Sequence, residues 1–306
     1  MITQFFRALL GKNFPRNPEA EALSQSELRA ISVGAVLAAV RIEYWDSLET
    51  SKTGNSRKTL HEWWSISCPQ TAIETLEGLK NKKHSRMYNV ILATNARRTW
   101  GQELHFEDFI KVYQHAGLPL VDENIAKKYP REAELVEPHI STLHKMSEGT
   151  PNEEINQTLE KLFGDDETIN LCVQIYKTAL DKYDSYTHST SNLTQTFNEL
   201  IKFGIVSSQS DLGRIDATAW DMGRMVNVAR WCYELKFISK AQAWEYIFHG
   251  EKESVARYND WAAFGRSYIT GRALWGGSGI QLTNTINIVD SLHKNEESPW
   301  NQFPLK

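Results

Sequence analysis

The chain has 306 residues, 41% of them hydrophobic and 24% charged, with a net charge of −4 at pH 7. This composition is that of an ordinary globular protein long enough to bury a sizeable core. Nucleic-acid binders usually have a basic face or a pI above about 9, whereas the pI here is near 6.2. We therefore expect no nucleic-acid partner.

The cysteines and the apolar runs limit the possible class further. Cys68, Cys172 and Cys232 are far apart and form neither a disulfide framework nor a metal-ligand spacing. No segment approaches the 18 or more continuous apolar residues of a membrane span. We expect a cytoplasmic protein with no membrane span, no metal and no cofactor.

The N-terminus has helical spacing of hydrophobic residues, at Ile2, Phe5, Phe6, Leu9 and Leu10. The apolar stretches are too short for a signal peptide. They predict a short amphipathic helix that packs on its own domain, with membrane or partner attachment as the alternative. Residues 11–23 follow as a linker, so residues 1–23 are set apart from a helical domain over 24–306.

In residues 24–117 several helix start signals occur. Ser24 and Glu27 form a capping box and predict a helix to about Trp45, in which Gly34 indicates close packing. Residues 49–59 are polar and are expected to form a loop. Pro69 suits the first position of a helix, and further helices are expected at 87–100 and 107–116.

The middle of the chain has weaker signals. Residues 118–150 are rich in proline and charge and are expected to form an irregular connector. Thr150, Pro151 and Glu153 then mark a helix start. Helices are expected at 151–163, 167–186 and 191–203, followed by a serine-rich loop at 207–210.

The last third carries six of the ten tryptophans, namely Trp220, Trp231, Trp244, Trp261, Trp275 and Trp300. A helix at about 216–237 is apolar around most of its circumference and should be buried. Ser239 and Gln242 cap the next helix, and the last long helix is expected to end at Gly276. Strand alternation is missing from the sequence, so we predict an all-α fold, a single irregular helical bundle with a Trp-rich C-terminal core.

Charged residues are set among these tryptophans, and they form the main candidate site. Asp221 and Arg224 are three residues apart and can pair along one helix face. One interpretation is an anion or ligand pocket with arginine donors, and the other is a structural ion-pair network that joins helices. The candidate residues are Trp220, Asp221, Arg224, Arg230, Trp261, Arg272 and Trp275.

Three weaker motifs are better explained by structure than by chemistry. Asp211, Asp216 and Asp221 could supply carboxylates, but Asp216 and Asp221 fall about 140° apart on a helix, so chance repetition and helix capping are favoured. The run G-G-S-G at 276–279 lacks the lysine and spacing of a phosphate loop and indicates helix termination. His139 and His144 are five residues apart, which is not the spacing of a helical metal site.

Several motifs together resemble one protein family. A-W-D-M-G-R-M-V-N-V-A-R-W (219–231), I-S-K-A-Q-A-W (238–244), Y-N-D-W-A-A-F-G-R-S-Y-I-T-G-R-A-L-W (258–275) and S-P-W (298–300) resemble the domain of unknown function 1266 (DUF1266). So do A-I-S-V-G-A-V-L (30–37) and residues 64–79. The resemblance implies a bacterial, helical protein with no established reaction. Its members occur among accessory genes, some near polymorphic toxin systems.

Two functional hypotheses follow. The first is a non-catalytic protein-binding protein, in its most concrete form an immunity protein that neutralises a toxin by direct binding. Exposed aromatic residues would anchor the interface, and the negative charge would steer it toward a basic toxin. The alternative is an enzyme or small-anion-binding protein that uses Asp221, Arg224, Arg230 and Arg272 in a Trp-lined pocket.

Overall fold

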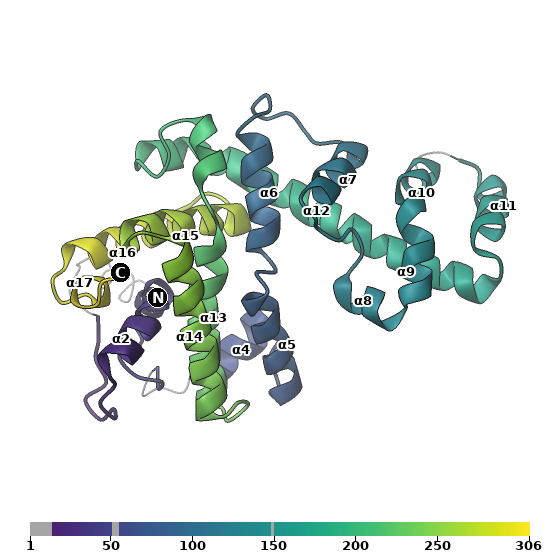
Figure 1. Cartoon of the computed structure of the whole chain (residues 1–306). Coiled ribbons are helices and arrows are strands. Elements are labelled where there is room, and N and C mark those ends of the chain that lie inside the picture. Colours follow the sequence, from purple (N-terminus) through teal and green to yellow (C-terminus); the bar gives the residue numbers. More distant parts are fainter. Residues whose placement is uncertain (1–13, 51–54, 148–149) are drawn as a thin grey trace. The chain divides into compact units, whose positions relative to one another are not determined.

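The computed structural model describes residues 14–50, 55–147 and 150–306 (Figure 1). Helices and loops account for all of these residues, and none of them lies in a strand. This confirms the predicted all-α class. The described residues divide into two compact units: a major unit, which consists of the residues up to Ala96 together with Asn192–Lys306, and a minor unit, Arg97–Ser191.

The major unit contains the N-terminal and C-terminal helices. Its elements are α2 (Gln25–Ser32), α3 (Ala35–Arg41), α4 (Ser56–Trp64), α5 (Pro69–Lys80), α6 (Ser85–Asn95), the end of α12 (Asp166–Lys202), η2 (Gln209–Arg214), α13 (Thr218–Glu234), α14 (Lys240–Arg257), α15 (Trp261–Gly276), α16 (Ile280–Lys294) and α17 (Pro299–Gln302).

Helix α13 forms the centre of the major unit. Every residue from Thr218 to Cys232 is buried, as its nearly all-round apolar sequence predicts. The helix packs against α14 and α15, beside which it lies in Figure 1, and also against α3, α4, α5 and α6. Any polar side chain on α13 must therefore find its partners inside the core.

Glycines let the neighbouring helices approach α13 closely. A Cβ atom on Gly271 of α15 would lie 2.3 Å from the Trp220 Cβ, and one on Gly34 would lie 2.6 Å from the Asn227 Nδ2. The Asn227 Nδ2 also donates to the Gly34 carbonyl at 2.7 Å. The expected close packing at Gly34 is confirmed, and its partner is α13.

The C-terminal core is rich in tryptophan, as predicted. The rings of Trp261 and Trp300 are stacked with centroids 5.1 Å apart, and Phe264 meets both of them edge-on. The Trp300 Nε1 donates to the Ser32 carbonyl at 3.0 Å. The last helix of the chain is thus tied to one of the first.

The minor unit has an aromatic core of its own. It contains α7 (Phe106–His115), α8 (Glu123–Lys128), α9 (Pro130–Val136), η1 (Glu137–His139), α10 (Ile140–Ser147), α11 (Asn152–Phe163) and most of α12. The Phe109 ring contacts Phe106, Tyr113, Tyr183 and Tyr186. This cluster joins α7 to α12.

Several predicted elements differ from the observed ones. The 118–150 connector is wrong as an irregular segment, because its described residues form α8, α9, η1 and α10. The helices expected at 167–186 and 191–203 are one helix, α12, because residues 187–190 contain neither glycine nor proline to interrupt it. The helix expected to run from Ser24 to about Trp45 is divided at residues 33–34 into α2 and α3.

Helices α4, α16 and α17 were also not predicted. Helix α4 begins within the expected polar loop, and α16 follows the glycines that end α15. The capping boxes at Ser24 and Ser239 and the proline start of α5 are confirmed. The N-terminal helix predicted in residues 1–10 lies outside the described residues, and the proposed split of the chain into 1–23 and 24–306 stays a prediction.

Candidate functional site

Asp221 lies at the junction of α13 and α6. Its Oδ2 accepts from the backbone N–H groups of His84 at 3.1 Å and Ser85 at 2.8 Å. Its Oδ1 accepts from the Arg224 Nη2 at 2.6 Å and lies 3.1 Å from the His84 Nδ1. Since the first N–H groups of a helix have no partner within it, the Asp221 carboxylate acts as an N-terminal cap for α6.

Electrostatics keep this carboxylate ionised. Burial raises the pKa of Asp221, but the hydrogen bond with His84 and the charge of Arg224 outweigh it and lower the pKa to about 2. Burial and the charge of Arg224 both lower the pKa of His84. The cluster is therefore an ion pair with a neutral imidazole at neutral pH.

Arg224 completes its contacts on aromatic rings and backbone. Its Nε donates to the Trp220 carbonyl at 2.9 Å, and its Cζ lies 4.3 Å from the Trp220 ring centroid and 5.4 Å from that of Trp64. Cation–π contacts of this kind favour a guanidinium that is shielded from water.

Arg230 lies elsewhere along α13 and is completely buried. Its guanidinium donates to the carbonyl oxygens of Ser47 at 2.9 Å and of Tyr44, and to the Asn227 Oδ1 at 3.2 Å. Burial lowers the pKa of Arg230 to about 10, against the nearby charges of Glu43, Glu234 and Asp46. The residue fixes the loop after α3 to the core.

Arg272 and Trp275 lie at the end of α15. The Arg272 Nη2 donates to the Gln281 Oε1 at 2.6 Å, and its Cζ lies 5.1 Å from the Trp275 ring centroid. The Trp275 ring is 6.0 Å from that of Trp220 and 43% exposed. Trp220 therefore links two arginine–tryptophan contacts, because its own ring faces Arg224 and the neighbouring Trp275 ring faces Arg272.

Trp261, the last candidate residue, belongs to the C-terminal core. Its Nε1 donates to the Phe303 carbonyl at 2.9 Å, and its ring stacks on Trp300. Arg230 and Trp261 thus have surroundings of their own. The other five candidates follow one another in contact, in the order Asp221, Arg224, Trp220, Trp275 and Arg272.

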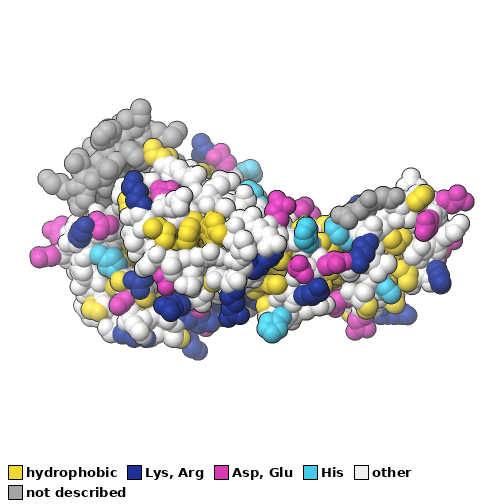
Figure 2. Space-filling model, turned by 90° about the horizontal axis from the view of Figure 1, so that it is seen from above, with side chains coloured by type: hydrophobic (Ala, Val, Ile, Leu, Met, Phe, Trp, Pro, Cys, Tyr) yellow, Lys and Arg dark blue, Asp and Glu magenta, His cyan; other side chains and the backbone are white. Residues whose placement is uncertain are grey.

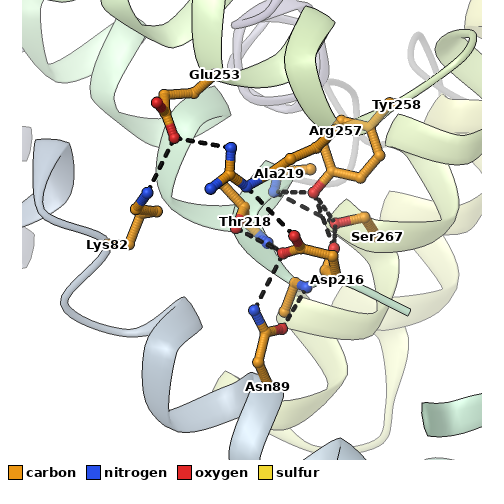
Figure 3. A network of polar contacts seen from close by, with 10 residues as sticks. Lys82, Asn89, Asp216, Thr218, Ala219, Glu253, Arg257, Tyr258 and Ser267 are labelled. Atoms are coloured by element: carbon orange, nitrogen blue, oxygen red, sulfur yellow. Dashed lines mark hydrogen bonds and ion pairs between the residues drawn. The ribbon is translucent and has the colours of Figure 1, made fainter. Parts of the chain in front are cut away.

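A second polar network surrounds the start of α13 (Figure 3). The Asp216 Oδ1 accepts from the Thr218 N–H at 2.9 Å and from the Asn89 Nδ2 at 3.1 Å, and its Oδ2 lies 3.3 Å from the Arg257 Nε. The Tyr258 hydroxyl accepts from the Ala219 N–H at 2.8 Å and donates to the Asp216 carbonyl at 2.8 Å. These contacts give the first N–H groups of α13 acceptors, with Asp216 one residue before the N-cap, Ala217.

The remaining sequence candidates are also placed. Asp211 accepts from the backbone of Ser207 and Ser208 and caps η2. His144 stacks on Phe106 with centroids 3.9 Å apart, whereas His139 contacts Phe163. The described residues contain no group of three or more His, Cys, Asp or Glu side chains arranged to hold a metal ion.

An open groove of about 470 Å³ lies beside α4. We call it the α4 groove; its lining residues are Arg57, Lys58, His61, Glu62, Ile66, Ser67, Leu235 and Phe237. Trp63 lies on the same helix and is 65% exposed. Basic and acidic side chains are interspersed over the face in Figure 2, without a continuous basic band among its described residues.

The sequence indicates the charged residues of the candidate site but not the residues that contact them. His84, Ser85 and Gln281 complete the surroundings of Asp221 and Arg272, yet they come from other helices and follow no recognisable spacing. Trp63 could have been noticed, because it adjoins a second tryptophan in a strongly polar stretch.

Comparison with known proteins gives one match. Residues 59–305 match a family described as "Protein of unknown function (DUF1266)". Searches of curated proteins and of solved structures find no match. Within the described residues, no helix has the length and apolar character needed to cross a membrane.

Proposed function

Because the chain belongs to the DUF1266 family, whose description assigns no reaction, we propose a function from its surface: a non-catalytic protein-binding protein that uses Trp63 and the α4 groove. The observation that carries the proposal is the 65% exposure of Trp63. Tryptophan is highly buried on average, and exposed indoles are frequent anchors of protein interfaces.

The α4 groove, which Trp63 does not line, is a second feature of the same helix that suits a protein partner. The groove combines apolar side chains, Ile66, Leu235 and Phe237, with charged ones at its rim. Covering the exposed part of the Trp63 ring would contribute roughly 3 kcal/mol from apolar burial alone. An apolar centre with a polar rim is the usual anatomy of an interface.

The charged side chains of the groove indicate the chemistry of the partner. Arg57, Lys58 and His61 are exposed, and the Lys58 Nζ is 3.9 Å from the Glu62 Oε1. Net negative charge favours a basic partner, as expected for the immunity hypothesis, but the local charge at the groove favours an acidic, apolar segment. We propose that an acidic segment of the partner docks here.

The buried candidate residues support a non-catalytic role. The charges of Asp221, Arg224 and Arg230 are all satisfied by helix caps, ring faces and backbone carbonyls. Groups held in this way stabilise the helices that they join and are not directed toward a substrate. The partner class that we propose is a toxin, which an immunity protein would block by direct binding in the bacterial cytoplasm.

The test is capture of a partner by the tagged full chain and by two variants. Trp63→Ala removes the proposed anchor, and Ile280→Ala is the matched control, because Ile280 is 67% exposed on a different helix. We expect one stoichiometric protein with wild type and Ile280→Ala, and at least tenfold weaker binding of the purified partner to Trp63→Ala.

Co-expression then tests the toxin hypothesis. Cells that express the captured partner should lose viability, and the wild-type chain should restore it while Trp63→Ala restores it less. Equal binding of the partner by wild type and Trp63→Ala would contradict the proposed surface. A partner that is harmless to cells would leave the surface but overturn the immunity role.

A further inference from the structure

Arg272 is a buried cation that pairs with no carboxylate among the described residues. It is 8% exposed, its Nη2 donates to the Gln281 Oε1, and its Nη1 has no hydrogen-bond partner in the described part of the chain. Burial lowers the pKa of Arg272, and the opposing contributions come from two tyrosines, Tyr268 and Tyr88, rather than from a carboxylate. A buried guanidinium in this state is costly.

The other two buried arginines provide an internal comparison. Arg224 has the Asp221 carboxylate at 2.6 Å. Arg230 donates to backbone and amide oxygens and lies near the charges of Glu43, Glu234 and Asp46. Both of these arginines thus have carboxylates nearby, and Arg272 differs from them in this respect.

Gly276, the first residue of the segment 276–279, lies directly against the Arg272 Nη1. A Cβ atom on Gly276 would lie 2.0 Å from the Arg272 Nη1, so no other residue leaves space for the guanidinium. Gly277 and Gly279 have φ angles of 64° and 114°, in the region that favours glycine. A Cβ atom on Gly279 would meet nothing within 4 Å, so the space beside it is open.

Helix α16 begins in the same place. Its N-cap is Gly279, which has no side chain to accept from the first N–H groups. The helix is 15 residues long, and its N-terminus carries the positive end of the helix dipole. Its second residue, Gln281, is the one that Arg272 holds, so the guanidinium and the start of the helix adjoin.

We propose that Arg272, the glycine-rich segment 276–279 and the N-terminus of α16 bind the phosphate group of a small molecule. The guanidinium supplies the positive charge that a lysine supplies in a phosphate loop, and the backbone N–H groups supply further donors. Trp275, 43% exposed and in contact with Arg272, offers a ring face to the group that carries the phosphate. This site is independent of the α4 groove.

The test measures binding of inorganic phosphate and phenyl phosphate to the purified full chain by calorimetry in a phosphate-free buffer. We expect saturable binding, with phenyl phosphate tighter because its ring can stack on Trp275. Arg272→Gln should weaken both ligands about tenfold or more, as expected for loss of a charged hydrogen bond.

A second pair of variants keeps Arg272 in place. Ile280→Pro removes one N–H at the first position of α16, where proline is tolerated, and Ile280→Ala removes the same apolar side chain but keeps that N–H. We expect several-fold weaker phosphate binding for Ile280→Pro alone. If Arg272→Gln does not fold, judged by its circular dichroism, this pair decides the question.

Two results would overturn the proposal. One is the absence of saturable phosphate binding to wild type. The other is equal phosphate affinity of wild type, a folded Arg272→Gln and Ile280→Pro. Loss of partner capture by Trp63→Ala has no bearing on either result, so the two proposals fail separately.

Discussion

Asp221 shows how a charged residue can lie in a core for structural reasons. One carboxylate oxygen accepts from two N–H groups at the start of α6, and the other lies beside both Arg224 and the His84 ring, so each oxygen has two partners. Removing one partner of a buried pair leaves the other charge uncompensated, which typically costs about 3–5 kcal/mol.

We therefore expect Asp221→Asn to lower the free energy of unfolding by about 3 kcal/mol or more. The measurement is urea unfolding at pH 7, with wild type and Asp211→Asn in parallel. Asp211 also accepts from backbone N–H groups at a helix start, but it lies on the surface helix η2, so its loss should cost much less than that of Asp221. Similar losses of unfolding free energy for both variants would show that the buried Asp221–Arg224 pair stabilises the protein no more than a surface cap does.

The same residue predicts a dependence of stability on pH. Because the pKa of Asp221 falls from its ordinary 3.8 to about 2 on folding, its contribution is complete above pH 3.8 and is lost as the pH falls to 2. The shift corresponds to about 2 kcal/mol. Stability curves of wild type and Asp221→Asn should converge over this range, and parallel curves would contradict the assignment.

Contacts within one helix can be predicted from the sequence, whereas contacts between helices cannot. The three-residue spacing of Asp221 and Arg224 predicted their pairing, because one helix fixes it. Nothing local predicts that the first residues of α6 meet Asp221, or that Gln281 meets Arg272. Those contacts depend on how separate helices pack, so the sequence does not show that Arg230 and Trp261 have partners apart from the other five candidates.

At the scale of elements, the approach of α15 to α13 depends on glycines, and Gly271 makes the closest of these contacts. A Cβ atom on Gly271 would lie 2.3 Å from the Trp220 Cβ and 2.7 Å from its Cγ, and both helices are buried there. Overpacking in a core typically costs about 1–3 kcal/mol or more. Helices α13 and α15 must therefore move apart if a side chain is added at Gly271.

We expect Gly271→Ala to lower the thermal midpoint by several degrees, whereas Gly78→Ala should leave it unchanged or raise it. Gly78 lies within α5, where a Cβ atom would meet only the Lys83 Cδ at 3.7 Å, and alanine favours a helix by up to about 1 kcal/mol over glycine. Differential scanning calorimetry of both variants makes the comparison. A lower midpoint for Gly78→Ala would contradict it.

Helix ends marked by side chains were predicted well, and helix breaks were not. Ser24, Pro69 and Ser239 begin helices because their local chemistry satisfies the first turn. The division of α2 from α3 at Gly34, by contrast, accompanies its close contact with Asn227 and Val226 of α13. Such a break follows from tertiary packing, which a local pattern does not contain.

At the scale of the whole molecule, the core extends beyond the family match. Residues 59–305 match the family, yet Ile31, Val33 and Val36 are at most 1% exposed, and α2 and α3 pack against α13, α14, α16 and α17. Burying three such side chains contributes about 5–9 kcal/mol. This is comparable to the total stability of a typical protein, about 5–15 kcal/mol.

We therefore expect a chain that starts at residue 59 to lose its cooperative thermal transition. Near-ultraviolet circular dichroism, which reports fixed tryptophan packing, should be reduced relative to the full chain at the same concentration, while part of the helical signal remains. A transition with the midpoint of the full chain would show that the N-terminal helices are dispensable.

The enclosure of α13 has a consequence for how relatives are compared. Thirteen of the residues that resemble the family lie at 219–231, and each of them is buried. A sequence signature made of buried residues indicates that a chain adopts this fold and carries no information about the residues on its surface. Proteins that share this signature share the fold and need not share a function. Functional similarity to this chain should therefore be judged at the two proposed sites, Trp63 and Arg272 with its neighbouring glycines.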